Sequence, residues 1–173
     1  MATNTHKIFG INGSYAVLSS RKYKISDIII QTGSIAERDG RISRIVGHYG
    51  GYVRFLPKKQ FKQKFGDFRT QGIVVIFSAE IETTLPKMDS VEGNHCLLIL
   101  DRLEDPQNFG QIIRTAVCAG VRGIIIPKHD SCKVTDRVIQ ISQGAFTEIP
   151  IYEVNNIHQT IDLLKKEEFW IVA

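Results

Sequence analysis

The chain has 173 residues, of which 43% are hydrophobic and 23% charged. These proportions are those of an ordinary globular protein, and they exclude a disordered, collagenous or low-complexity chain. Its apolar runs, such as residues 73–77, are far shorter than the roughly 20 residues of a membrane-spanning helix, and residues 1–10 lack the apolar stretch of a signal peptide. The sequence therefore predicts a cytoplasmic protein that does not associate with membranes. Its unclustered cysteines are expected to be reduced and buried.

The net charge of +4 is divided unevenly along the chain. Residues 1–80 contain 13 basic and 5 acidic side chains, a net charge of +8, whereas residues 81–173 contain 9 basic and 13 acidic side chains, a net charge of −4. A small region with such an excess of positive charge attracts polyanions, among which nucleic acid is the most common. We therefore expect the first part of the chain to bind nucleic acid.

Residues 1–79 are predicted to form a small α/β domain. The apolar periodicity predicts a helix at residues 10–20, a strand at 26–32, a helix at 35–51 that ends at a glycine pair, and a strand at 71–79. The polar stretch that follows contains Pro86 and Gly93, has no sustained period and coincides with the change of charge. We predict a linker at residues 80–95.

Residues 96–173 are predicted to form a second domain with a parallel sheet wrapped by helices. Short β-rich runs at residues 95–101, 122–127, 148–154 and 169–173 alternate with helical patterns of about a dozen residues. Asp105 and Pro106 have the residue types of a helix start, and Gly120 that of a helix end. Two further helices are predicted from apolar stripes, Val134, Val138, Ile141 and Ala145 for one, and Ile157, Ile161 and Leu164 for the other.

A basic and aromatic segment precedes the predicted linker. Its cationic residues are Lys58, Lys59, Lys62, Lys64 and Arg69, which could contact nucleic-acid phosphates. Phe61, Phe65 and Phe68 recur at helical spacing, so they are expected in the core rather than as platforms for base stacking.

The loop that follows the predicted strand ending at Asp101 lies where parallel sheets bind their ligands, beyond the carboxyl ends of the strands. Gly110 and Arg114 are four residues apart and thus share one face of the helix that follows. The glycine would leave an open shelf beside the guanidinium, which a backbone or a phosphate could approach.

The pattern in this region is Asp105-Pro106-x-Asn108-x-Gly110-x-x-x-Arg114-Thr115-Ala116, followed by Ala119-Gly120-Val121, Ile126-Pro127 and Ser142-x-Gly144-Ala145. It resembles the motifs of the SpoU (TrmH-like) RNA ribose methyltransferases. In the first domain, Gly10-Ile11-Asn12 and Gln71-Gly72-Ile73 resemble the ribosomal-protein-like domain with which this family binds its substrate. The resemblance extends from about residue 8 to residue 173.

The resemblance implies transfer of a methyl group from S-adenosylmethionine to a ribose 2′-hydroxyl of ribosomal or transfer RNA, by a homodimeric enzyme that needs no metal. Arg114 matches the family's catalytic arginine. Because a guanidinium hardly ever loses its proton, we expect it to clamp phosphate and act electrostatically. Asn108 is the second catalytic candidate and would orient the ribose or hold the loop, although capping of its helix is an equally good explanation. The RNA-binding candidates are Lys58, Lys59, Lys62, Lys64 and Arg69.

Members of the family continue past the last predicted strand with a glycine-rich turn and a Ser-Leu-Asn segment, which tie the trefoil knot and build the S-adenosylmethionine pocket. Neither occurs before Ala173. We therefore expect an incomplete methyltransferase domain at residues 96–173, without the knot-forming segment and with the cofactor site beyond Ala173. Such a truncated chain is predicted to be inactive alone.

Two other functions remain open. The chain could be a catalytically incompetent RNA-binding fragment of the family, or an unrelated nucleotide-binding α/β module. The second is disfavoured because no glycine-rich phosphate loop follows a predicted strand. Arg114 could also be an ordinary solvated charge, and Ser142 and Gly144 are expected to be structural.

Overall fold

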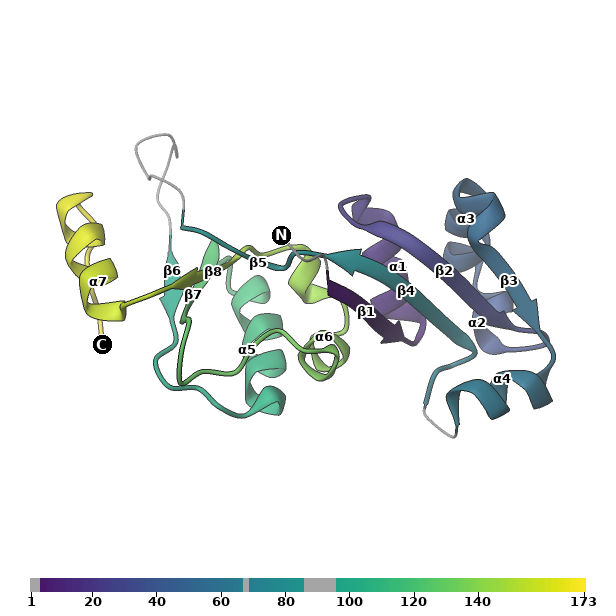
Figure 1. Cartoon of the computed structure of the whole chain (residues 1–173). Coiled ribbons are helices and arrows are strands. Elements are labelled where there is room, and N and C mark those ends of the chain that lie inside the picture. Colours follow the sequence, from purple (N-terminus) through teal and green to yellow (C-terminus); the bar gives the residue numbers. More distant parts are fainter. Residues whose placement is uncertain (1–3, 67–68, 86–95) are drawn as a thin grey trace.

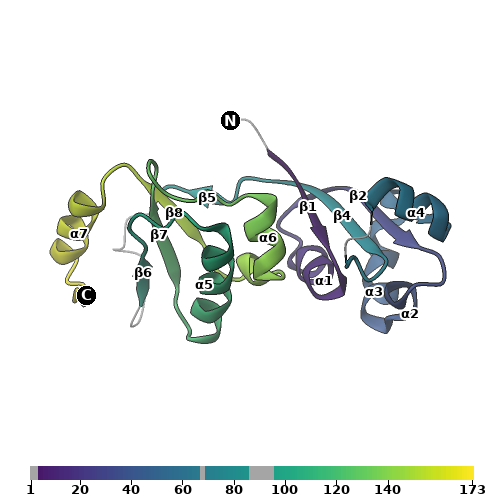
Figure 2. The same ribbon diagram turned by 90° about the horizontal axis from the view of Figure 1, so that it is seen from below.

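Two four-stranded sheets organise the computed structural model, which describes residues 4–66, 69–85 and 96–173. Sheet A has the strand order β1-β4-β2-β3 and sheet B the order β5-β8-β7-β6. In both views the two sheets follow one another along an elongated molecule, and the chain passes from one to the other through β4 and β5 (Figures 1 and 2). The α/β class predicted for both parts of the chain is confirmed.

Sheet A is mixed. Its strands are β1 (Asn4–Phe9), β2 (Lys24–Gln31), β3 (Val53–Leu56) and β4 (Ile73–Ala79). Strands β1 and β2 run antiparallel to β4, and β3 runs parallel to β2. The sequence predicted β2 and β4 but not β1 and β3, because β1 contains only two apolar residues and β3 is a short, largely exposed edge strand.

Both faces of sheet A are covered, which explains its nearly continuous apolar strands. Ile28 and Ile30 point into the main core, whereas Ile29 and Val74 point to the opposite face, where Phe61 packs on them. The helices of this part are α1 (Ile11–Ser20), α2 (Ile35–Arg38), α3 (Gly40–Val46), the 3-10 segment η1 (Gly47–Tyr52) and α4 (Lys58–Phe65).

The single helix predicted at residues 35–51 is wrong, because the chain breaks at Asp39. This residue has an extended backbone with ψ 117°, and its carboxylate accepts hydrogen bonds from the backbone N–H groups of Arg41 at 2.9 Å and Ile42 at 3.2 Å. Asp39 therefore starts a new helix instead of continuing the old one.

Sheet B is parallel throughout, as the sequence predicted. Its strands are β5 (Glu82–Thr83), β6 (Leu97–Ile99), β7 (Gly123–Pro127) and β8 (Ile151–Val154). Strand β5 falls inside the predicted linker 80–95, so the start of that segment belongs to sheet B. Pairing with β8 makes it a strand despite its polar sequence. The rest of the predicted linker, 86–95, lies outside the described residues.

The helices of this part are α5 (Pro106–Cys118), α6 (Asp136–Ser142), the 3-10 segment η3 (Ala145–Thr147) and α7 (Ile157–Lys166). Helix α6 stops before the predicted Ala145 because Gln143 and Gly144 have left-handed φ angles of 50° and 97°. Helix α7 lies at the end of the molecule remote from sheet A (Figures 1 and 2).

Two expectations about apolar residues are wrong. The strand predicted at residues 169–173 is absent, and the side chains of Trp170 and Val172 are 94% and 92% exposed. An apolar, β-branched segment becomes a strand only where a neighbouring strand offers hydrogen bonds, and none pairs with this one in the described part of the chain. Of the cysteines expected to be buried, Cys132 is buried but Cys96 and Cys118 are exposed.

The two sheets share one apolar core. Its buried residues come from both parts of the chain, and Phe77 of β4 stacks on Phe146 of η3 with ring centroids 6.1 Å apart. Gly144 lies so close to α1 that an added Cβ would be 2.3 Å from the Cβ of Ala16. Burial of this kind across the two parts stabilises their mutual arrangement.

Hydrogen bonds also join the two parts. The side-chain amide of Gln140 on α6 accepts from the backbone N–H of Phe9 at 2.7 Å and donates to its carbonyl at 3.0 Å. His6 Nδ1 lies 2.9 Å from Asp136 Oδ1, and Lys22 Nζ donates to the carbonyl of Thr147 at 2.6 Å. Helix α6 is thus attached to β1 in the middle of the strand, at His6, and at its carboxyl end, at Phe9.

Candidate functional site

Helix α5 begins at the carboxyl edge of sheet B, after the loop that follows β6. Asp105 caps it: one carboxylate oxygen accepts from the N–H of Gln107 at 3.1 Å and the other from the N–H of Asn108 at 3.2 Å. Pro106 occupies the first turn, where its missing N–H costs nothing. The Asp-Pro pair of the motif is therefore explained by the start of the helix.

Asn108 is exposed, and its side chain has no hydrogen-bond partner among the described residues. Capping was one of the explanations for this residue, but Asp105 performs that role. The Asn108 amide therefore remains available for a ligand at the carboxyl edge of the sheet.

Arg114 is also exposed, and it has no ion pair in the described part of the chain. It lies six residues beyond Asn108 on α5, which corresponds to about 9 Å along the helix axis and about 120° around it. The structure thus places the two catalytic candidates on one helix but on different faces. A group held by both would have to extend over the helix surface between them.

The open shelf expected beside Gly110 does not exist. An added Cβ at this glycine would lie 2.6 Å from the Cβ of Ile141 and 3.1 Å from the carbonyl oxygen of Val138, both on α6. Gly110 is needed because α5 and α6 pack closely there. Ser142 is structural as expected, since it is 1% exposed and donates to the carbonyl of Ile139 at 2.8 Å.

The loops after β6 and β7 are tied together at the same edge of sheet B. Cys132 N–H donates to the carbonyl of Leu103 at 2.6 Å, and Lys128 N–H donates to that of Val154 at 2.8 Å. Lys133 forms an ion pair with Glu153 of β8. These contacts fix the backbone from which α5 begins, so Asn108 projects from a well-supported helix end.

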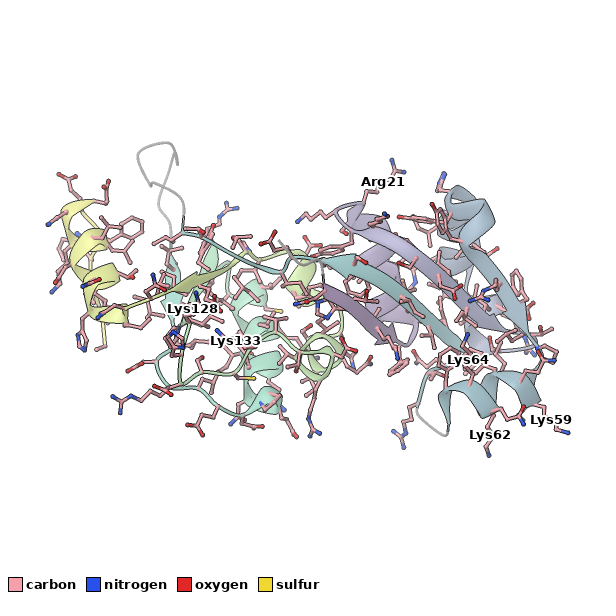
Figure 3. The ribbon with its side chains drawn as sticks, in the orientation of Figure 1. Arg21, Lys59, Lys62, Lys64, Lys128 and Lys133 are labelled. Carbon is pink, nitrogen blue, oxygen red and sulfur yellow. The ribbon has the colours of Figure 1, made fainter. Side chains whose placement is uncertain are left out.

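Helix α4 carries the predicted basic surface. Lys58, Lys59, Lys62 and Lys64 are all exposed, and Lys59 and Lys62 extend outward from the helix (Figure 3). The ammonium group of Lys64 lies 5.7 Å from the centre of the Phe65 ring. Helical geometry places Lys58, Lys59 and Lys62 within about 100° of one another around α4 and Lys64 on a different side of the helix. We call these four exposed side chains together the α4 lysine surface.

The aromatic residues of this segment anchor α4, as the sequence predicted. Phe61 is 2% exposed and lies 4.9 Å, ring centre to ring centre, from the half-buried Phe65. Phe68 lies outside the described residues. Phe61 and Phe65 hold α4 against sheet A, and Lys59 and Lys62 point away from that contact into solvent (Figure 3).

Arg69 lies beyond the end of α4. It lines a cleft of about 440 Å³ between sheet A and helix α6, which we call the inter-sheet cleft. Its other polar lining side chains are Asn12, Gln71, Gln140 and Gln143. In the sequence, Asn12 and Gln71 stood out only as part of a motif, and Gln140 and Gln143 were missed because nothing in their spacing indicates that α6 packs on β1.

A second cleft, of about 720 Å³, is lined by titratable groups. Its titratable lining residues are His6, Glu80, Lys133, Asp136 and Glu153. Four of these are paired with one another, His6 with Asp136 and Lys133 with Glu153. Among the described residues, no group of three or more His, Cys, Asp and Glu side chains could hold a metal ion. No described helix is long and apolar enough to cross a membrane.

Tyr23 lies between the two parts of the chain. Its ring centre is 5.3 Å from that of Phe77 and 5.7 Å from that of Phe146. Burial raises the pKa of its hydroxyl to about 12, and the nearby carboxylate of Glu148 acts in the same direction. The folded protein therefore keeps Tyr23 neutral well above the ordinary pKa of tyrosine.

The sequence and the fold of this chain are similar to those of a known class of proteins. The model of the SpoU rRNA Methylase family matches residues 95–173. A Staphylococcus aureus protein (strain MSSA476) named for the TrmH family of tRNA/rRNA methyltransferases is 34% identical over 155 residues, which cover 87% of this chain and 62% of that protein.

The 23S rRNA (guanosine-2′-O-)-methyltransferase RlmB of Shewanella oneidensis is 32% identical over 169 residues, which cover 96% of this chain and 69% of RlmB. The chain therefore belongs to the SpoU rRNA methylase family. This membership excludes the unrelated nucleotide-binding module. The chain spans 62% of the length of the S. aureus relative.

Solved structures share the fold. The SpoU methyltransferase AviRb from Streptomyces viridochromogenes, crystallised with AdoMet, superposes with a TM-score of 0.71 over 95% of this chain and 59% of AviRb, at 13% identity. An rRNA methyltransferase from Sinorhizobium meliloti gives a TM-score of 0.67 at 21% identity, over 94% of this chain and 59% of that one. The similarity extends through both sheets.

Proposed function

We infer that the chain is the RNA-binding and part of the catalytic region of a methyltransferase that modifies ribosomal or transfer RNA at a ribose 2′-hydroxyl. Residues 1–79 would anchor the RNA, and residues 96–173 would contribute to methyl transfer. The observation that carries this proposal is the exposed Arg114, without an ion pair in the described residues, on a helix whose motif belongs to the family. Its guanidinium is available for a substrate.

Anchoring is assigned to Lys58, Lys59, Lys62 and Lys64 of the α4 lysine surface and to Arg69 in the inter-sheet cleft. Four ammonium groups on one short helix suit a phosphate backbone, which they recognise by charge without reading sequence. The positive charge of residues 1–80 supports this assignment, since it attracts RNA from a distance.

Arg114 is proposed to hold a phosphate next to the reacting ribose and to favour the oxyanion that forms as the hydroxyl loses its proton. A planar guanidinium can donate two parallel hydrogen bonds to one anion, which fixes orientation as well as charge. Asn108 would orient the ribose with its free amide. Methyl transfer requires the hydroxyl oxygen to be held in line with the methyl group, and this alignment depends on the positions of the side chains that bind the RNA.

S-adenosylmethionine is the proposed methyl donor, in which the sulfonium already activates the methyl group. The residues described do not fit it by themselves, because neither cleft includes Arg114 or Asn108. We therefore expect the chain alone to bind S-adenosylmethionine weakly or not at all, and no step is assigned to a donor site within it. RNA binding without methyl transfer is accordingly the second candidate function of this chain.

Titration calorimetry with S-adenosylmethionine and with a ribosomal RNA fragment separates the two candidates. RNA binding without donor binding is the expected result for the chain alone. Saturable micromolar donor binding would instead place a donor pocket within residues 96–173. Absence of RNA binding would contradict both candidates.

A further inference from the structure

We propose that the inter-sheet cleft binds one unpaired nucleotide of the RNA, a second contact point beside the α4 lysine surface. This inference rests on the proposed function and names the part of the substrate that the cleft would hold. The cleft has about 440 Å³ of space and is lined by residues of both parts of the chain. That volume falls within the range of small-ligand pockets.

The hydrogen bonds within the cleft fix the direction of its amides. Gln71 Oε1 accepts from the N–H of Ile11 at 2.8 Å, and Gln140 Oε1 accepts from the N–H of Phe9 at 2.7 Å. Asn12 Oδ1 accepts from the guanidinium of Arg41 at 3.3 Å. Because each oxygen faces an N–H donor, the orientation of all three amides is determined by their partners.

The cleft consequently offers mostly hydrogen-bond donors. The amide nitrogens of Asn12 and Gln71 have no partner among the described residues, and Gln140 retains the second hydrogen of its amide nitrogen. Gln143 is exposed and adds an amide, and Arg69 adds a guanidinium. None of the lining residues described is acidic. Such a site favours a ligand rich in acceptor oxygens and negatively charged.

An RNA nucleotide has this chemistry. Its phosphate suits Arg69, and its ribose oxygens and base carbonyls suit the amides. Amide side chains recognise the edges of bases that are not paired, and RNA-binding proteins generally read unpaired bases in this way. A base within a duplex is paired and stacked on its neighbours, so it would have to leave the stack before it could enter the cleft. The cleft should therefore distinguish single strands from duplexes.

The cleft is also preformed. Gln140 holds the end of β1 through both of its hydrogen bonds, and Gly144, which follows α6, packs closely on Ala16 of α1. A site that needs no rearrangement loses less free energy on binding. Gln140 of α6 and Gln143 directly after it thus link RNA recognition to the part of the chain that carries Arg114.

The test measures fluorescence anisotropy of a labelled RNA single strand of about 12 nucleotides and of the same strand in a duplex. Gln143→Gly removes the amide without backbone strain, because Gln143 has a φ of 50°. We expect this variant to bind the single strand about three- to tenfold more weakly, and Arg69→Ala about tenfold more weakly. Duplex binding should change much less with Gln143→Gly.

The matched controls are Gln159→Ala on α7 and Arg122→Ala just before β7, which remove the same chemical groups from exposed positions that do not line the cleft and lie outside residues 1–80. Both controls should leave single-strand binding unchanged. Competition with uridine 5′-monophosphate tests whether the cleft binds a nucleotide within an RNA strand or a free mononucleotide. If the free mononucleotide displaces the strand at equal concentration, the cleft binds free nucleotides and the proposal is wrong.

Wild-type protein offers a second readout that does not depend on the folding of variants. A single strand carrying 4-thiouridine should form photochemical crosslinks to residues 9–13 and 140–143. Crosslinks confined to residues 58–65, with full binding by the cleft variants, would overturn this inference and leave the proposed RNA-binding function intact. If the wild type binds neither strand nor duplex, the proposed function fails as well.

Discussion

The regions around sheet A and sheet B are both α/β, but they differ in charge and in the signals their sequences carry. Residues 1–80 have a net charge of +8 and residues 81–173 a net charge of −4. Four exposed lysines of the first region lie on α4, whereas the exposed Arg114 and Asn108 belong to the second region. Under the proposed function, attraction of RNA and chemistry on RNA belong to different regions that share one apolar core.

The largest expected effect is the loss of methyl transfer when Arg114 is replaced, with RNA binding retained. A chimaera that adds the C-terminal length of the S. aureus relative provides a background for measuring methyl transfer. There, Arg114→Ala should lower the single-turnover rate about a hundredfold or more, because it removes charge stabilisation of the reacting oxygen. RNA affinity should change little.

Arg114→Lys is the matched control for charge alone. It should restore little activity, since an ammonium group cannot reproduce a planar pair of donors. An Arg114→Ala protein that keeps its rate but melts at a lower temperature would contradict the catalytic assignment. Asn108 would then become the stronger candidate.

The next effect concerns the α4 lysine surface. Replacing Lys58, Lys59, Lys62 and Lys64 with Ala should weaken RNA binding by an order of magnitude or more at low salt. Each lost phosphate contact should reduce the slope of log affinity against log salt by about 0.7 to 0.9. The double variant K165A/K166A on α7 is the control, with no change expected. An unchanged slope in the four-lysine variant would exclude this surface.

A smaller effect tests whether the two regions share a core. Gly144→Ala should lower the free energy of unfolding by about 2–4 kcal/mol, because its φ is 97° and the new Cβ would clash with Ala16. Gly33→Ala is the matched control, since its φ is 76° but no atom lies within 4 Å of the added Cβ. A loss no greater than that of the control would mean that the contact between the regions is loose. The free energies can be measured by denaturant titration.

The smallest effect is the alkaline stability contributed by Tyr23. Its pKa is raised from 10.0 to about 12, so the folded state binds the proton more tightly than the unfolded state. The resulting stability is fully present below pH 10 and is lost as the pH rises through about 12. Tyr23→Phe should remove this part of the decline in melting temperature between those pH values. Identical pH profiles for both proteins would show that Tyr23 is not buried between the regions.

The two regions also differed in what the sequence could predict. Sheet B and α5 followed from apolar runs and from the Asp105-Pro106 pair, since these signals are local. In sheet A, β1 was missed because its partner β4 is more than sixty residues away, and pairing rather than composition makes it a strand. The break at Asp39 depends on a single side chain that caps a helix.

Some parts of the candidate site could likewise be predicted from the sequence, and others could not. Arg114, Asn108 and the lysines of α4 were found from motif and charge, and the structure exposes all of them. The inter-sheet cleft was not predicted, because it exists only where α6 packs on β1. The shelf at Gly110 was a wrong expectation, since a glycine in a motif can serve a neighbouring helix as well as a ligand.

The most direct test of the separation between anchoring and chemistry is the dependence of the single-turnover methylation rate on RNA concentration, measured in the chimaera. Arg114→Ala should lower the rate at saturating RNA and leave the half-saturating concentration unchanged. The four-lysine variant should raise the half-saturating concentration and leave the saturating rate unchanged. If both variants change the same parameter, RNA anchoring and methyl transfer are not separated between the two regions, and the account is contradicted.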